Sequence, residues 1–311
     1  MVDAVSKAFF HLIARSRSLS RLASRYGLST PTSFARRFIA GETTAEAIEA
    51  ARALEARGLS QTLDHLGESV STAAEADKAT RDYLGVIHDV VAAGIGRNIS
   101  LKLTQLGLDL DRVTALDNLR RVLEAATTHG FFVRIDMENS PYTEVTLDIF
   151  ETLWGLGYKN LGIVLQSALH RTERDLARVI ALGGRVRLVK GAYKEPASVA
   201  YQRKADVDAA YLRLMRILLS TGSFPALATH DPAIIDAAKL FATREGIGSD
   251  RFEFQMLYGV RRDLQAALAA QGYGMRVYIP FGRQWFPYFM RRLGERPANV
   301  AFVVRSLLRE G

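Results

Sequence analysis

From residue 59 onward, short apolar or alternating segments recur along the chain, and a longer stretch with helical spacing follows each of them. The short segments cover residues 59–66, 98–106, 131–138, 161–167, 186–193, 225–230, 251–257 and 275–281. The helical stretches cover residues 71–93, 112–129, 142–157, 171–183, 203–221, 232–246, 260–271 and about 285–294. Strands that alternate with helices predict βαβ units and a parallel sheet.

The number of these units favours a closed α/β barrel over an open sheet. Eight strand–helix pairs over about 240 residues fit a (βα)8 TIM-like barrel. An open dinucleotide-binding sheet predicts a G-x-G-x-x-G turn after a strand, and the nearest glycine pairs, at 94–96 and 272–274, precede strands instead. We therefore predict a (βα)8 barrel whose last helix follows the eighth strand.

The first 58 residues are mostly helical in pattern. The segment 43–58 predicts a helix with Thr44 as N-cap and Gly58 as C-cap, and Ala47 three residues after Thr44 gives no capping box. We predict a helical N-terminal extension over residues 1–58 and a single catalytic barrel domain over 59–311. Residues 4–26 contain no acidic residue and resemble an amphipathic transit peptide as much as an ordinary first helix.

Composition and charge narrow the possible functions. The 311 residues are 48% hydrophobic and include no cysteine, which excludes disulfides, thiolate zinc sites and a cysteine nucleophile. The formal charge of +8 is spread along the chain, so it favours general solubility over an acidic membrane surface and favours nucleic acid least. The six histidines have no metal-binding spacing, and no metal site is predicted.

Charged residues lie inside the predicted strands or where they end. Lys102, Asp136 and Arg187 each stand between two apolar neighbours, so alternation turns them to the face opposite those neighbours. A buried charge is costly unless it is paired. These three side chains therefore indicate either a structural ion-pair network or a site for a charged ligand, and the sequence favours the two equally.

A second polar cluster follows the last predicted strand. Tyr288 and Arg291 are spaced i, i+3 on a helix, as are Arg292 and Glu295. Two adjacent arginines over a barrel mouth suit a carboxylate or phosphate clamp, although a solvated basic face has the same pattern. His230, at the end of the sixth strand, could act as a ligand or a base.

Six strings together resemble the proline dehydrogenase family. They are ISLKLTQLG, RIDMENSPYTE, VRLVKGAYKEP, LATHDP, FEFQMLYG and YIPFGRQWFPYFMRRLGERPANVAF, and the likeness runs in order from about Gly67 to Arg305. The family includes monofunctional bacterial enzymes and the matching domain of bifunctional proline-utilisation proteins. Tyr258, Asp231 and Lys194 differ from the bifunctional proteins and fit the monofunctional branch.

The resemblance implies a reaction and a setting for it. L-proline is oxidised to Δ1-pyrroline-5-carboxylate, the first step of proline catabolism to glutamate. Hydride passes from proline C5 to N5 of non-covalently bound FAD, and the electrons then pass to a membrane quinone. The enzyme is expected in the bacterial cytoplasm, peripheral at the inner membrane, and the apolar face Phe9–Ile13 is expected to aid that contact.

The resemblance also implies site residues. Three cations bind the proline carboxylate, three side chains form the pocket of the ring and three acids support them: Lys102, Arg291, Arg292, Leu257, Tyr278, Tyr288, Asp136, Glu295 and Glu68. Asp136 is expected to steady Lys102, and Glu68 to pair with the first arginine and gate the site. The expected FAD contacts are Gln166, Arg187, Val189, Gly191, Ala192, Tyr193, Lys204, Thr229, His230 and Gln255.

The residues alone leave two other interpretations of the function open. A phosphate-binding barrel would use the same arginines on phosphate, and a non-enzymatic basic protein would bind nucleic acid with strong salt dependence. Nothing in the sequence identifies a residue that must accept the amine proton of proline, so water remains a candidate.

Overall fold

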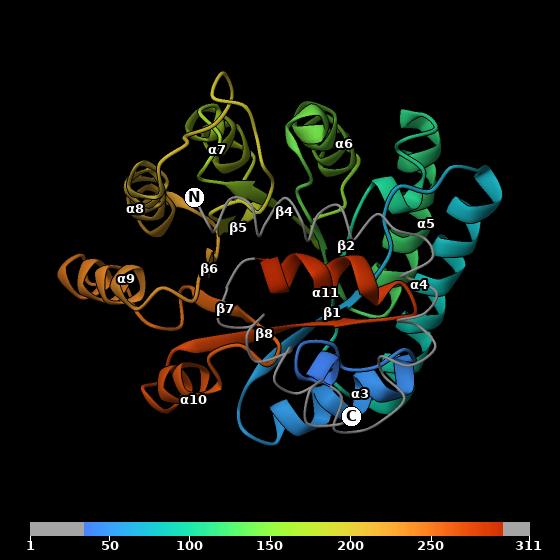
Figure 1. Ribbon diagram of the computed structural model, residues 1–311, viewed down its shortest axis with the longest axis horizontal. Coiled ribbons are helices and arrows are strands. Elements are labelled where there is room, and N and C mark those ends of the chain that lie inside the picture. Colours follow the sequence, from blue (N-terminus) through green and yellow to red (C-terminus); the bar gives the residue numbers. More distant parts are fainter. Residues whose placement is uncertain (1–33, 295–311) are drawn as a thin grey trace.

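A closed barrel of parallel strands forms the centre of the protein, and this confirms the predicted fold class (Figure 1). The computed structural model describes residues 34–294. Its strands, which pair in sequence order, are β1 (Ser60–His65), β2 (Asn98–Leu101), β3 (Phe132–Ile135), β4 (Leu161–Gln166), β5 (Arg185–Val189), β6 (Ala226–Ala228), β7 (Glu253–Leu257) and β8 (Gly274–Phe281). Pairing of β1 with β8 closes the barrel.

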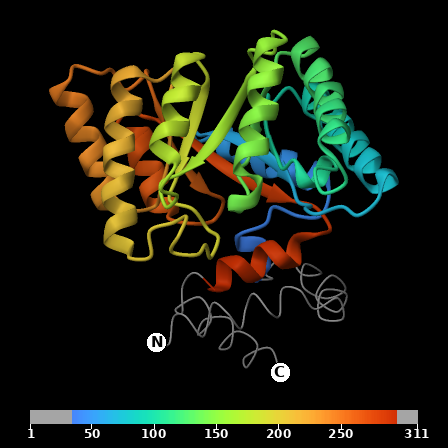
Figure 2. The same ribbon diagram turned by 90° about the horizontal axis from the view of Figure 1, so that it is seen from above.

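A helix follows each strand, as the sequence pattern predicts. The helices are α3 (Thr44–Glu55), α4 (Ala73–Ala93), α5 (Arg112–Thr128), α6 (Thr143–Gly155), α7 (Thr172–Ala181), α8 (Lys204–Thr221), α9 (Pro232–Arg244), α10 (Arg262–Ala270) and α11 (Trp285–Gly294). Helices α4 to α10 surround the barrel, and α11 lies across one of its ends (Figures 1 and 2). Three short 3-10 helices add to them: η1 (Phe34–Arg37), η2 (Thr104–Leu106) and η3 (Ser140–Tyr142).

Apolar side chains fill the layer between strands and helices, whereas polar side chains occupy the barrel interior. Leu101 and Ile135 belong to the main hydrophobic core and are fully buried. Ser100 and Arg187 instead meet through a hydrogen bond of 3.0 Å, although 87 residues separate them. The alternation of a strand accounts for both layers, because successive side chains point to opposite faces.

Two sequence predictions need correction in detail. The expected strands at 98–106 and 131–138 are too long, since β2 ends at Leu101 and β3 at Ile135. Lys102 and Asp136 therefore lie just past the carboxyl ends of their strands, where barrel enzymes place their chemistry. The N-cap of α3 is Thr43 and not Thr44, and Thr43 forms a capping box with Glu46. Shifting the cap by one residue brings a glutamate to the required third position.

The segment before the barrel packs into it where it is described. Ala47, Ile48, Ala51 and Leu54 of α3 share the main core with the strands. The division of the chain at residue 58 remains a prediction. Residues 1–33 and 295–311, which include the predicted Phe9–Ile13 face and Glu295, lie outside the described residues.

A smaller hydrophobic cluster holds α11 over the barrel end. Phe38 and Ile39 next to η1 pack with Leu66 and with the apolar face of α11. Trp285 at the start of α11 donates an Nε1 hydrogen bond to Glu42 Oε1 at 3.1 Å. These contacts fix the helix that carries Tyr288, Arg291 and Arg292 next to the carboxyl ends of the strands.

Candidate active site

A cavity of about 620 Å³ opens at the carboxyl ends of the strands, which is the catalytic face of this barrel type. Its volume lies in the usual range for small-molecule and cofactor sites. Residues of strands β4 to β8, of the loops that follow the strands, and of helices α8, α9 and α11 line it: Lys102, Asp136, Met137, Val164, Gln166, Arg187, Val189, Lys190, Gly191, Ala192, Tyr193, Lys204, Ala228, Thr229, His230, Asp231, Pro232, Gln255, Met256, Leu257, Arg261, Tyr278 and Tyr288.

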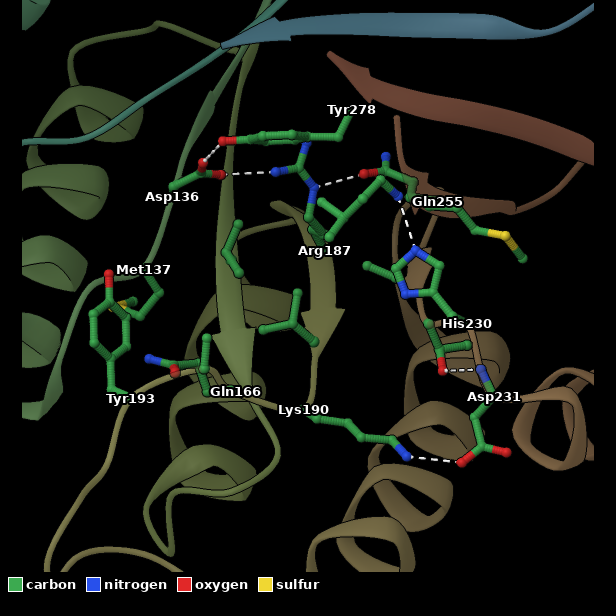
Figure 3. A pocket seen from close by; sticks show the side chains of 18 of the residues that line it. Asp136, Met137, Gln166, Arg187, Lys190, Tyr193, His230, Asp231, Gln255 and Tyr278 are labelled. Atoms are coloured by element: carbon green, nitrogen blue, oxygen red, sulfur yellow. Dashed lines mark hydrogen bonds and ion pairs between the residues drawn. The ribbon is translucent and has the colours of Figure 1, made fainter. Parts of the chain in front are cut away.

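The Arg187 guanidinium lines this cavity and lies between Asp136 and Gln255 (Figure 3). Its Nη1 donates to Asp136 Oδ1 at 2.7 Å, and its Nε donates to Gln255 Oε1 at 2.6 Å. Tyr278 donates its hydroxyl to the other Asp136 oxygen at 2.7 Å. Burial first, and then the charge of Asp136, raise the pKa of Tyr278 well above its ordinary value. Tyr278 therefore stays protonated and keeps this donor role.

Lys102 brings a second buried cation to the cavity, and its carboxylate partner is Asp64. The Lys102 Nζ lies 3.7 Å from Asp64 Oδ2, and Asp64 is fully buried. Burial alone would lower the pKa of Lys102, but the charges of Asp64 and then Asp136 outweigh it and raise that pKa. The expectation that Asp136 steadies Lys102 stays a prediction: Asp136 acts on Lys102 through its charge and makes its direct contacts with Arg187 and Tyr278.

Asp64 was missed by the sequence analysis. It stands in β1 between Leu63, which is apolar, and His65, which is polar, so the pattern that marks Lys102 is present on one side only. Burial raises the pKa of Asp64, and Lys102 offsets only part of that effect. Within the described part of the chain, neither carboxylate oxygen of Asp64 accepts a hydrogen bond of normal geometry, although the nearby Tyr278 hydroxyl also acts to lower the pKa of Asp64. The ion pair with Lys102 is therefore its main compensation for burial.

The other side of the cavity carries lysines paired with aspartates. The Lys190 Nζ lies 2.6 Å from Asp208 Oδ1 and 2.9 Å from Asp231 Oδ2. Lys204, at the start of α8, pairs with the same two aspartates and keeps most of its side chain exposed. The hydrogen bond from Lys190 is the main reason that the pKa of Asp231 lies below its ordinary value. Cations at this rim suit the phosphates of a nucleotide cofactor.

The loops around the cavity present ring and amide groups with defined orientations. His230 Nε2 accepts the backbone N–H of Leu257 at 3.0 Å, so a neutral ring carries its proton on Nδ1. Gln166 donates its amide to the Glu138 carbonyl at 2.8 Å. Gly191 has a φ of +110°, and a Cβ there would stand 3.0 Å from Gln166 Oε1. Glycine at 191 therefore lets the backbone run close to Gln166.

The predicted residues fall into three groups with respect to this cavity. All ten expected FAD contacts line it, and so do Lys102, Asp136, Leu257, Tyr278 and Tyr288. Glu68 follows β1 outside the lining, although its charge helps to raise the pKa of Lys102. Arg291 and Arg292 belong to α11, but their side chains lie outside the described part of the structure, as does Glu295.

The described residues hold neither a metal-binding cluster nor a membrane-spanning helix. Between residues 34 and 294, no three His, Asp or Glu side chains are grouped so that they could hold a metal ion. Over the same described range, no helix combines the length and the apolar character that a membrane crossing requires.

Comparisons with known proteins point to one family. A family model described as proline dehydrogenase matches residues 47–305. A curated proline dehydrogenase from Deinococcus radiodurans is 47% identical over 279 residues, which are 88% of this chain and 90% of the relative. Proline dehydrogenase 2 from Bacillus subtilis is 40% identical over 306 residues, which are 98% of this chain and all of the relative.

Solved structures agree with the sequence comparisons. A crystal structure of proline utilization A from Bdellovibrio bacteriovorus, described as inactivated by N-propargylglycine, matches with a TM-score of 0.78 and 28% identity. The match covers 83% of this chain and 32% of that one. This chain thus spans about a third of the length of that larger protein.

Proposed function

The chain belongs to the proline dehydrogenase family, and from this premise we propose that its cavity oxidises L-proline to Δ1-pyrroline-5-carboxylate. The observation that carries this assignment is the convergence of fifteen expected site residues on a single cavity. They come from separate strands and loops between Lys102 and Tyr288, and neighbours in sequence cannot account for their meeting. The convergence supports the proposed roles of these residues.

We propose non-covalent FAD as the resident cofactor. The lining fits such a group, because it combines a cationic rim at Lys204, amide groups at Gln166 and Gln255, and the close backbone approach that Gly191 permits. When bound, FAD supplies the acceptor for the hydride that proline loses. The chain's own contribution is orientation, since Arg187 is buried and held by three hydrogen bonds within the protein.

We propose that Lys102 binds the proline carboxylate together with Arg291 and Arg292 of α11. A buried cation with a raised pKa stays charged at neutral pH and attracts an anion. The apolar part of the substrate ring would pack on Leu257 and Tyr278, which line the same cavity. Nearby cations also lower the pKa of the substrate amine, which favours loss of its proton before hydride transfer. We assign that proton to water.

We further propose that electrons leave to a membrane quinone and that the protein contacts the bilayer peripherally. The support for this contact is the apolar face Phe9–Ile13 with the basic residues beside it, because the formal charge of +8 is spread along the chain and does not by itself favour a lipid surface. Deletion of residues 1–16 should lower the fraction of protein bound to vesicles of anionic phospholipid. Equal binding of the truncated and the full chain would remove the N-terminal segment from this proposal.

Product formation tests the proposed reaction directly. The FAD-loaded protein is incubated with L-proline and an artificial electron acceptor, and a reagent specific for Δ1-pyrroline-5-carboxylate traps the product. Arg291→Ala should raise KM for proline by about 10- to 100-fold with FAD still bound, because a charged hydrogen bond contributes about 1.5–3 kcal/mol. Arg213→Ala, which removes an arginine on the outer surface of α8, is the matched control. Absence of product from FAD-loaded protein would contradict the reaction.

A further inference from the structure

Two charged side chains lie in the barrel interior beneath the cavity and take no part in its lining. Glu253 begins β7 and is 4% exposed, and Arg276 lies on the neighbouring strand β8. The Arg276 Nε donates to both Glu253 oxygens, at 3.0 and 3.1 Å, and its Nη1 donates to the Gln61 carbonyl at 2.7 Å. Burial would raise the pKa of Glu253, but Arg276 outweighs it and lowers that pKa. Glu253 is therefore an ionised carboxylate.

The Glu253 carboxylate fixes the amide of Gln255, two residues along the same strand. Their side chains share the inward face because strand residues alternate. Gln255 Nε2 lies 2.5 Å from Glu253 Oε1, and an ionised carboxylate can only accept a hydrogen bond. The amide must therefore turn its NH2 toward Glu253 and its Oε1 toward Arg187. The Arg187 Nε uses that acceptor at 2.6 Å.

The amide orientation decides whether Arg187 is held. A reversed amide would present its NH2 to the Arg187 Nε–H, so that two donors would face each other. The remaining hydrogen bonds of Arg187, to Asp136 and Ser100, leave that edge of the guanidinium unsupported. Because Arg187 is 4% exposed, water does not readily replace the lost acceptor.

We propose that Glu253 and Arg276 are positioning residues, which orient Arg187 at the cavity through the amide of Gln255. The inference rests on the proposed function, in which Arg187 lies beside the flavin. Arg276 holds Glu253, Glu253 orients Gln255, and Gln255 orients Arg187. At metal sites, outer partners that orient the ligands affect affinity or activity by about 10- to 100-fold, and we expect an effect of the same order here.

The test compares Glu253→Gln with a matched control. Glutamine has the same shape but allows either amide orientation at Gln255. We expect kcat to fall by about 10- to 100-fold, with a change in KM for proline below about threefold, since the proposed carboxylate clamp is untouched. Asp175→Asn in α7 also removes a buried carboxylate beside an arginine, Arg171 at the N-cap of that helix, away from the cavity. This control should leave both constants unchanged.

A double-variant cycle separates positioning from general damage. In an Arg187→Lys background the contact with Gln255 is already lost, so adding Glu253→Gln should lower kcat by less than about twofold. If Glu253→Gln keeps its full effect in that background, or has none in the wild type, the proposal is wrong. Should Glu253→Gln not fold, Arg276→Lys is used in the same cycle with the same expectation.

The same cycle is measured on the affinity of the apoprotein for FAD, by titration of flavin fluorescence without proline. Glu253→Gln should weaken binding by about tenfold in the wild-type background and by less than about twofold beside Arg187→Lys. Additive losses in FAD affinity would overturn the relay. This readout does not depend on proline, so it distinguishes failure of the relay from failure of the proposed reaction.

Discussion

Removal of the Asp64 charge should destabilise the protein strongly, and removal of the Lys102 charge together with it should not. Asp64→Asn keeps the side-chain shape and leaves Lys102 in the interior without its carboxylate partner. At the observed 3.7 Å, two unit charges attract by about 4.5 kcal/mol with an effective dielectric constant of about 20. Breaking a buried pair from one side typically costs about 3–5 kcal/mol. We expect a loss in that range for Asp64→Asn.

The double variant Asp64→Asn/Lys102→Met carries no unpaired buried charge at this position. A pair replaced as a whole by neutral groups is often close to neutral in stability. We therefore expect the double variant to recover most of the loss. The assay is urea unfolding followed by circular dichroism, with all variants free of FAD. A loss below about 1 kcal/mol for Asp64→Asn, or a double variant as unstable as the sum of both single variants, would refute this reasoning.

Three further predictions concern other parts of the fold. Burial lowers the pKa of His65 below 6.5, so the stabilising contribution of the neutral ring is present above pH 6.5 and is lost as the pH falls. Thermal unfolding of His65→Phe should therefore depend less on pH between 5 and 7 than that of the wild type, and an unchanged pH profile would contradict this. Gly191→Ala should weaken FAD binding by about tenfold, because a φ of +110° strains any residue with a Cβ. A fluorescence titration that gives the wild-type affinity would exclude a role of Gly191 in FAD binding. Thr43→Ala breaks the capping box with Glu46 and should lower the free energy of unfolding in urea by about 1 kcal/mol. The control Thr44→Ala should lower it only a little, and equal losses for the two variants would count against Thr43 as the cap.

The order and type of the elements could be predicted from sequence because the periodicity of each segment is local. The ends of the strands could not be predicted in this way. Leu103 and Leu106 continue the apolar pattern of β2, although the chain there already forms η2. Burial in a loop packed under a helix looks the same in sequence as burial in a strand. This is why Lys102 was expected within the strand and lies just after it.

The candidate site could be predicted as a set of residues but not as a set of contacts. Alternation marks Lys102, Asp136 and Arg187 as inward-facing, yet it cannot say which charges meet across a barrel. The Tyr278–Asp136 hydrogen bond joins residues 142 positions apart, and only the closed barrel brings them together. Asp64 has a weaker alternation signal, because its neighbour His65 is polar, and the sequence therefore does not mark it as an inward-facing charge.

An absorbance spectrum between about 300 and 600 nm, taken before and after anaerobic addition of L-proline, tests the central claim most directly. The account predicts flavin bands in the purified or FAD-reconstituted protein and their bleaching by L-proline. A protein that shows the bands but keeps them unchanged with L-proline would contradict the proposed substrate, and one that takes up no FAD would contradict the proposed cofactor.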